Sequence, residues 1–265
     1  MKALTALIAG TAASVLSLVA AGAAPAPMAR VGPGVLRPVY MPEPGITEVK
    51  VKGFELDRVP VTNSEFAAFV ARDPRWRRDR VPALLADAGY LAHWAGPIAP
   101  GKQVAPDSPV TGVSWFAAKA YCAAAGKRLP TEAEWELAAA AGRQGPDGHA
   151  EPGFDARALV AATTPVDAGR RRVGQDAPNF WGIHDLHGLV WEWVFDFNGT
   201  LVTGDSREGK SADTLRFCGV GALAAGDKSD YAGFLRAAFR SALEARYTPA
   251  SLGFRCARDV EGGMR

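Results

Sequence analysis

The chain has 265 residues, and its 30 Lys and Arg residues nearly balance its 28 Asp and Glu residues. A formal net charge of +2 excludes the strongly basic proteins that bind nucleic acid through bulk charge, so we expect no nucleic-acid partner. The length also exceeds that of small modules held together by disulfides. It suits one globular domain with its own core.

The first residues have the pattern of an export signal. Lys2 supplies a positive charge, residues 3–20 are apolar or small and uncharged, and Ala23 ends a small-residue cleavage site. No arginine pair precedes the apolar stretch, which favours the general secretory route over the twin-arginine route. The alternative is a retained membrane anchor, but a stretch rich in Ala and Gly makes a weak spanning helix.

These features divide the chain into three parts. Residues 1–23 are predicted to be a signal peptide, and the Pro- and Gly-rich residues 24–38 a flexible leader. Residues 39–265 are predicted to form a single domain, with no membrane span once the signal is cleaved. The sequence leaves the oligomeric state open.

The first elements expected in the domain are a strand and a short helix. Residues 46–58 alternate apolar and polar side chains, as a half-buried strand does. Thr62 and Glu65 have the spacing of a capping box, which predicts a helix over 63–71. Residues 72–109 are rich in Pro, Gly and Arg and are expected to form an ordered loop region. Its expected anchors are three aromatic residues, Trp76, Tyr90 and Trp94.

Two further helices are predicted in the middle of the chain. The first begins after Ser114, carries a stripe of apolar residues and ends at Gly126. The second opens with another capping box, formed by Thr131 and Glu134, and runs to Ala141.

Loops and short strands are expected in the second half. Residues 143–181 show no sustained period and are predicted to be loop. A buried aromatic strand is predicted at 189–195. Further strands are expected at 214–224, 234–240 and 252–257. Three short helices, scattered strands and long loops together predict an α+β domain with little regular secondary structure.

Three segments carry the most specific patterns: GKRLPTEAEWE at 126–136, GIHDLHGLVWEW at 182–193 and LGFRC at 252–256. The first has a purely structural interpretation, because its acidic residues fall in the first turn of a helix, where the helix dipole favours negative charge. In the second, His184 and His187 lie beside carboxylates, a set of ligands that could bind zinc, iron or copper. A spacing of three residues serves such a metal only if the segment is helical.

In this order the three segments resemble the formylglycine-generating enzyme superfamily, also called the sulfatase-modifying factor superfamily. The resemblance runs from about residue 48 to the C-terminus and is most specific over 109–142, which is similar to the family's signature almost residue by residue. It implies the family's variant of the C-type lectin fold. It also implies that 182–193 is a loop, which argues against a transition-metal site at the two histidines. A fold alone does not assign a function.

The resemblance implies a structural calcium ion at this loop. The matching positions are Asp185 and Glu192 through their side chains, and Gly188 and Val190 through their backbone carbonyls. These are the hard oxygen ligands that calcium prefers. The alternative is a turn in which Glu192 accepts hydrogen bonds from backbone amides. Asp185 replaces the family's more common Asn, and Leu189 replaces a second Asn, which puts the loop's hydrogen bonding in doubt.

Cysteine placement argues against the family's best-known reaction. The resemblance implies a disulfide between Cys122 and Cys256, which leaves Cys218 unpaired. The family's oxidase binds copper through two closely spaced cysteines before its LGFRC-like segment, at places that align here near Asp227 and Ala232. Residues 219–255 contain no cysteine, so the two-cysteine copper site is absent and copper is not expected. Cys218 alone is a weak catalytic candidate, as a nucleophile or single metal ligand, against a buried, inert thiol.

Three arginines recur near the C-terminus: Arg236, Arg240 and Arg255. Buried ion pairs with Asp or Glu are one interpretation, and binding of an acidic substrate group is the other.

Two functions from different classes follow. The segments RFCG, DYAGF and SLGFRCA look like a periplasmic subgroup associated with copper nitrite reductases, whose members are described as accessory or maturation factors. This predicts a calcium-stabilised, non-oxidase protein that binds a protein or peptide partner in the periplasm. The alternative is an oxidoreductase of altered chemistry in periplasmic maturation or, more weakly, formylglycine generation on a sulfatase. The sequence leaves open whether the protein is an enzyme.

Overall fold

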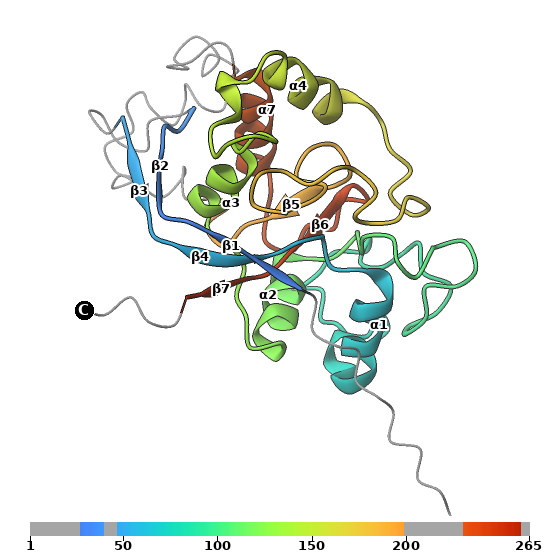
Figure 1. Ribbon diagram of the computed structural model, residues 1–265. Helices are drawn as coiled ribbons and strands as arrows, with labels where there is room; N and C mark the ends of the chain where they lie inside the picture. The colour runs from blue at the N-terminus through green and yellow to red at the C-terminus, as the bar shows by residue number, and fades with distance from the viewer. Residues whose placement is uncertain (1–26, 40–46, 199–229, 261–265) are drawn as a thin grey trace, which may run out of the picture.

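A three-stranded antiparallel sheet runs across the molecule (Figure 1). The computed structural model describes residues 27–39, 47–198 and 230–260. Strand β1 (Met28–Val31) pairs with β4 (Phe54–Asp57), and β4 pairs with β7 (Ala257–Asp259). Leu56 lies opposite Ala29 on one side and Ala257 on the other, and all three are buried. The sheet therefore joins the two ends of the domain.

A second pair of antiparallel strands lies beside this sheet. Strand β2 (Gly34–Leu36) pairs with β3 (Val49–Val51). The expectation of a flexible leader at 24–38 is therefore wrong for the residues that form β1 and β2. The physical reason is that β1 buries Ala29 and Val31 in the core, while Gly and Pro at 32–34 turn the chain between two strands. The strand predicted at 46–58 is divided into β3 and β4.

The three predicted helices are confirmed as α1 (Asn63–Arg72), α2 (Trp115–Ala124) and α3 (Glu132–Ala139). Both predicted capping boxes are present. Glu65 accepts from the backbone N–H of Thr62 at 2.8 Å, and Glu134 accepts from that of Thr131 at 2.8 Å. These caps satisfy amide groups that the first helical turn leaves without partners.

The predicted ordered loop region lies between α1 and α2 and contains one short 3₁₀ turn, η1 (Pro74–Trp76). Two of its predicted anchors, Tyr90 and Trp94, are each only 2% exposed. The indole nitrogen of Trp94 donates to Oδ1 of Asn63 at 2.9 Å, which ties the loop to the start of α1.

The described residues of the second half form two helices where none was predicted. Helix α4 (Phe154–Thr163), preceded by the 3₁₀ turn η2 (Gly148–Ala150), lies in the expected loop 143–181. Helix α7 (Tyr231–Ser241) occupies the position of the strand expected at 234–240, so that prediction is wrong. The strand expected at 214–224 lies outside the described residues.

The two C-terminal segments 189–195 and 252–257 contain short strands, as predicted. Strand β5 (Trp191–Trp193) pairs in parallel with β6 (Leu252–Phe254). Gly253 is required here, because a Cβ at this position would lie 2.6 Å from the carbonyl oxygen of Val110.

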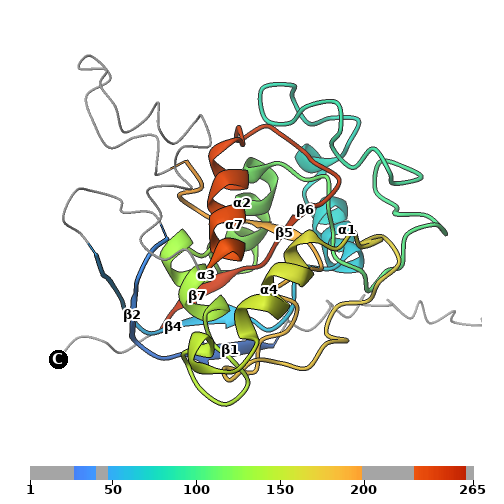
Figure 2. The same cartoon turned by 90° about the horizontal axis from the view of Figure 1, so that it is seen from above.

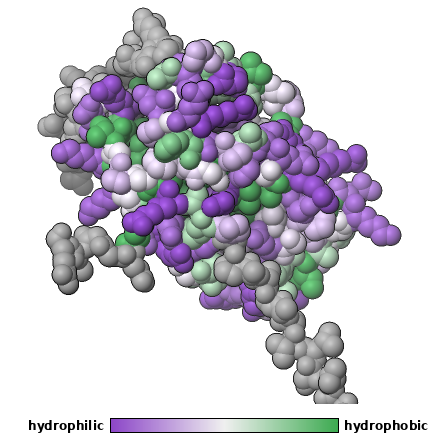
Figure 3. Space-filling model, in the orientation of Figure 1, coloured by the Kyte–Doolittle hydropathy of each residue, from purple (hydrophilic) through white to green (hydrophobic). Residues whose placement is uncertain are grey.

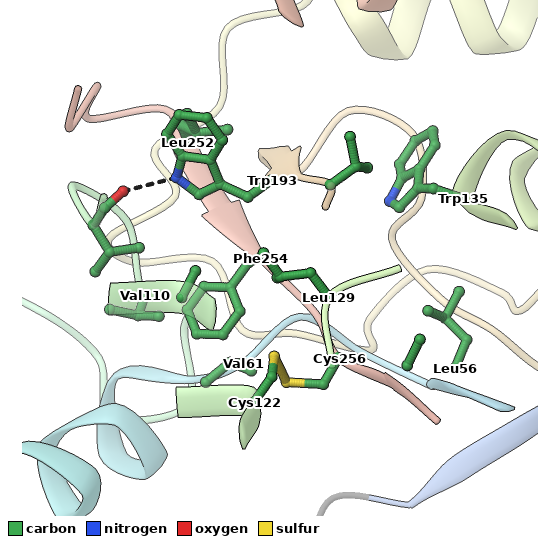
Figure 4. Packing of buried hydrophobic residues seen from close by; sticks show 14 of the residues in the cluster. Leu56, Val61, Val110, Cys122, Leu129, Trp135, Trp193, Leu252, Phe254 and Cys256 are labelled. Atoms are coloured by element: carbon green, nitrogen blue, oxygen red, sulfur yellow. Dashed lines mark hydrogen bonds between the residues drawn. A yellow bond between two sulfur atoms is a disulfide. The ribbon is translucent and has the colours of Figure 1, made fainter. Parts of the chain in front are cut away.

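The core surrounds these strands, and Figure 4 shows part of it around Phe254 and Trp193. The indole nitrogen of Trp193 donates to the carbonyl of Val113 at 2.8 Å. A disulfide joins Cys122 of α2 to Cys256, which lies between β6 and β7, and both cysteines are fully buried. This is the pair that the family resemblance implied.

Helices α3, α4 and α7 lie above the sheet in Figure 1, with α1 and α2 below it, and Figure 2 shows α3, α4 and α7 close to one another. The face drawn in Figure 3 is largely hydrophilic, with hydrophobic residues in small separate groups. No helix within the described ranges is long and apolar enough to cross a membrane. The observed architecture confirms the predicted α+β, loop-rich class.

Candidate functional site

Two arginines of α7 reach across to the acidic face of α3. Arg236 donates from Nε and Nη2 to the carboxylate of Glu136, with a shortest distance of 2.7 Å. Arg240 donates from Nη1 to Glu136 at 2.5 Å and to Glu132 at 3.2 Å. Residues four apart lie on the same helical face, so the two helices pair their charges turn by turn. The ion-pair interpretation of Arg236 and Arg240 is confirmed.

This cluster packs on Trp135. The guanidinium carbon of Arg236 lies 5.5 Å from the centroid of the Trp135 ring, and that of Arg240 lies 4.9 Å away. Burial opposes ionisation of Glu136, but the two guanidinium groups outweigh it and lower the pKa of Glu136 to about 2. Burial raises the pKa of Glu132, against the attraction of Arg240.

A second buried ion pair lies at the edge of the Trp135 ring that carries the indole N–H. The carboxylate of Glu192 accepts from Nε and Nη2 of Arg255 at 2.7 and 2.8 Å, and also from the indole nitrogen of Trp135 at 2.8 Å. The parallel pairing of β5 and β6 places Glu192 opposite Gly253, two residues before Arg255. Both charged side chains are 0% exposed. The ion-pair interpretation is therefore confirmed for Arg255 as well.

Next to these ion pairs the described residues enclose a pocket of about 640 Å³. Its walls come from α4 and the loop after it, from segment 186–192, from α7 and from segment 250–251. Arg236, Arg240, Trp135 and Glu192 line it on one side. This volume lies within the roughly 300–1,000 Å³ that small-ligand sites occupy.

His187 lines this pocket and also three smaller ones beside it. Its Nε2 is 3.0 Å from the carbonyl oxygen of Ala139, so Nε2 carries the proton and donates it, and Nδ1 keeps its lone pair. Burial, followed by the nearby charge of Arg236, lowers the pKa of His187 to about 4. The imidazole is therefore neutral at pH 7 and offers a hydrogen-bond acceptor.

The two histidines considered for a transition metal do not combine into a site. Nδ1 of His184 lies 2.7 Å from the carbonyl oxygen of Asp176, whereas His187 bonds to Ala139, and the segment is not helical. Across the described ranges, no group of three or more His, Cys, Asp or Glu side chains is placed to hold a metal ion.

The four positions expected to bind calcium differ in how they fit a cation. Asp185, at a φ of 60°, accepts from the backbone N–H of Gly174 through Oδ2, while its Oδ1 is buried without a hydrogen-bond partner. Burial raises the pKa of Asp185. No hydrogen bond within the described part of the chain is directed to the carbonyl of Gly188 or Val190. These three positions leave oxygen atoms available, but Glu192 is already bound to Arg255 and Trp135.

The cysteine positions can be placed only in part. Cys218 and Asp227 lie outside the described residues. Ala232, the other position that the resemblance is expected to align near an oxidase cysteine, is buried in the first turn of α7.

Sequence reasoning missed the pocket because its walls are far apart along the chain. One signal was present, since Arg236 and Arg240 are spaced by one helical turn and so are Glu132 and Glu136. That matching spacing could have indicated two facing helices.

The fold and the site together define a class of protein: a loop-rich α+β scaffold, closed by a disulfide between distant parts of the chain, with a pocket beside buried ion pairs. Residues 22–260 match the family described as the sulfatase-modifying factor enzyme 1-like domain. The chain belongs to this family.

Individual relatives agree with this assignment. The formylglycine-generating enzyme of Thermomonospora curvata is 30% identical, over 84% of this chain and 88% of the relative. The inactive Cα-formylglycine-generating enzyme 2 of Bos taurus is 33% identical, over 56% of this chain and 62% of the relative.

A solved structure agrees as well. The structure of PvdO from Pseudomonas aeruginosa superimposes with a TM-score of 0.51 at 23% identity, covering 88% of this chain and 94% of that one. This similarity concerns the fold alone, and it confirms the predicted fold of the formylglycine-generating enzyme family.

Proposed function

We propose that this protein is an exported, non-oxidase member of its superfamily that binds a protein or peptide partner in the periplasm. In this proposal it acts as an accessory or maturation factor for another exported enzyme. The general secretory signal expected at residues 1–23 supports the location. Similarity to a relative that carries the name of an inactive enzyme is consistent with a scaffold that has lost the oxidase reaction.

The observation that carries the proposal is the number of available thiols. The chain has three cysteines, and two of them form the buried disulfide between Cys122 and Cys256. Cys218 is then the one thiol left, whereas a copper(I) site of the family's kind needs two soft thiolate ligands a few residues apart. The scaffold is retained without the ligands for its best-known reaction, and the pocket provides a surface for binding.

A copper nitrite reductase is the client that we name first. The support comes from three segments that resemble the subgroup associated with these enzymes: RFCG at 216–219, DYAGF at 230–234 and SLGFRCA at 251–257. Two of the three lie in or beside the secondary structure that builds the pocket, since 230–234 opens α7 and 251–257 contains β6.

The test is a deletion of the gene in its own bacterium, followed by measurement of the activity and copper content of the periplasmic nitrite reductase. We expect both to fall, and to be restored by the wild-type protein and equally by Cys218→Ala. Unchanged nitrite reductase would contradict this client. Rescue by the wild-type protein but not by Cys218→Ala would favour an enzyme instead.

Calcium is part of the same proposal. Asp185 and the carbonyls of Gly188 and Val190 would hold the ion, and the unpartnered Oδ1 of Asp185 supports this. Glu192 could contribute only while it also binds Arg255. We expect calcium to raise the melting temperature of the wild-type protein and not that of Asp185→Gly, which removes the carboxylate at a residue whose φ is 60°. The exposed Asp79→Gly serves as the control.

The second candidate is an oxidoreductase of altered chemistry, which the similarity to a formylglycine-generating enzyme along most of the chain favours. Cys218 would be its reactive group. Formylglycine generation itself is the weaker form of this candidate, because the aligned position 232 carries alanine.

A further inference from the structure

The arginines at the pocket carry more hydrogen-bond donors than the ion pairs use. Arg236 binds Glu136 through Nε and Nη2, which leaves Nη1 without an acceptor among the described residues. Arg240 uses Nη1 alone, which leaves Nε and Nη2 without one. Arg255 is the contrast, since its Nε, Nη1 and Nη2 all donate to protein oxygens.

These unused donors are reached from the pocket. Arg236 and Arg240 are only 8% and 4% exposed, and both line it. Three side-chain polar atoms in the described ranges are sealed from solvent without a partner, and they belong to Asp107, Trp181 and Asp185. The guanidinium nitrogens of Arg236 and Arg240 are not among these sealed atoms, and both side chains line the pocket. Donors that are open to solvent can be hydrated, and an anionic ligand would replace that water with stronger, charge-assisted hydrogen bonds.

Part of the remaining wall is apolar. Trp191 of β5 stacks on Phe239 of α7, with ring centroids 4.6 Å apart and ring planes inclined by 22°. Leu189, Val190 and Val166 continue this surface. The other acidic groups in the lining do not oppose an anion strongly, because Glu192 is paired with Arg255 and Asp167 is largely exposed beside Arg170.

We propose that this pocket binds a carboxylate attached to an apolar or aromatic body, with the carboxylate on the free N–H groups of Arg236 and Arg240. The inference rests on the proposed binding function and names the chemistry of what is bound. The carboxylate could belong to a side chain of a peptide partner or to a free organic acid, and the experiment separates these sources.

The first measurement is calorimetric titration of the mature protein at pH 7 with 3-phenylpropanoate and with its neutral amide, 3-phenylpropanamide. We expect the acid to bind roughly tenfold more tightly, the size of one charge-assisted hydrogen-bonded pair. Equal affinity for the acid and the amide would overturn the inference.

Two sets of variants test whether the acid binds in this pocket. Arg240→Gln should remove the preference for the acid and leave the affinity for the amide unchanged. Because this change also disturbs the pairing with Glu136, a second variant leaves the ion pairs intact. Ala250 is exposed at the pocket. We expect Ala250→Glu to weaken binding of the acid, and Ala250→Gln to bind it as the wild type does. Identical affinities for these two variants would overturn the placement.

The last comparison uses two blocked peptides, N-acetyl-Phe-Glu-Phe-amide and its Gln counterpart. Tighter binding of the Glu peptide supports a peptide carboxylate as the ligand. If 3-phenylpropanoate binds but the two peptides do not differ, the carboxylate site stands and the ligand is a free acid. The peptide partner of the proposed function is then contradicted.

Discussion

Glu136 is the carboxylate that two buried guanidinium groups share. Its charge should therefore contribute more to the free energy of unfolding than the charge of a carboxylate in a surface pair. We expect Glu136→Gln to lower the free energy of unfolding by about 3 kcal/mol, because it removes one partner from a buried ionic cluster. Glu48→Gln removes the carboxylate of an exposed pair with Arg37 and should cost less than about 0.5 kcal/mol. Urea denaturation measures both, and equal effects would contradict the burial and pairing described for Glu136.

The same residue predicts how stability depends on pH. The pKa of Glu136 is about 2 in the folded protein, below its ordinary value of 4.5. Its contribution is therefore present above pH 4.5 and is lost as the pH falls from 4.5 towards 2. Between pH 4.5 and 3 the loss is on the order of 2 kcal/mol.

The comparison with Glu136→Gln isolates this effect, because the other titrating groups are common to both proteins. The difference in stability between the wild type and the variant should shrink as the pH falls from 4.5 to 3. A difference that stays constant across this range would show that Glu136 is not held ionised in the fold.

At the scale of elements, β1 shows that the domain begins before residue 39. Val31 of β1 is fully buried, whereas Val35 of β2 is 50% exposed. We expect Val31→Ala to destabilise the protein by about 2 kcal/mol, and the matched Val35→Ala by less than about 0.5 kcal/mol. Thermal or urea unfolding measures both. A result in which Val31→Ala is as mild as Val35→Ala would support a flexible leader after all.

The elements that could be predicted from the sequence are those with explicit boundary signals. Thr62 with Glu65, and Thr131 with Glu134, mark helix starts that do not depend on the rest of the fold. Helix α7 lacked a legible pattern because its buried face includes Arg236 and Arg240, which count as polar in any search for apolar periodicity. Helix α4 begins after Gly153 without a side-chain cap, so its start carries no comparable signal.

The candidate site was predictable to a smaller extent than the helices. The ion-pair interpretation of the three arginines followed from their residue type, but their partners could not be chosen. Glu136 lies 100 residues from Arg236, and only the packing of α7 on α3 brings them together. The pocket depends on the same packing and on α4, which was expected to be a loop.

At the scale of the whole molecule, the disulfide closes a loop of 134 residues between Cys122 and Cys256. On the chain-entropy account this stabilises the fold by roughly 5 kcal/mol. We expect the double variant Cys122→Ala, Cys256→Ala to lose most of this amount in urea denaturation. Cys218→Ala is the control for loss of a cysteine, and we expect it to have a much smaller effect. Comparable losses for both would show that the disulfide does not stabilise the domain as described.

The central claim is that the family's scaffold is retained here without its copper chemistry. Elemental analysis of the mature protein, purified from periplasm without chelators, tests it most directly. The account predicts calcium near one equivalent and no stoichiometric copper, because Cys218 is the one thiol outside the disulfide. Stoichiometric copper would contradict the account and show that the protein has a metal site of a different kind.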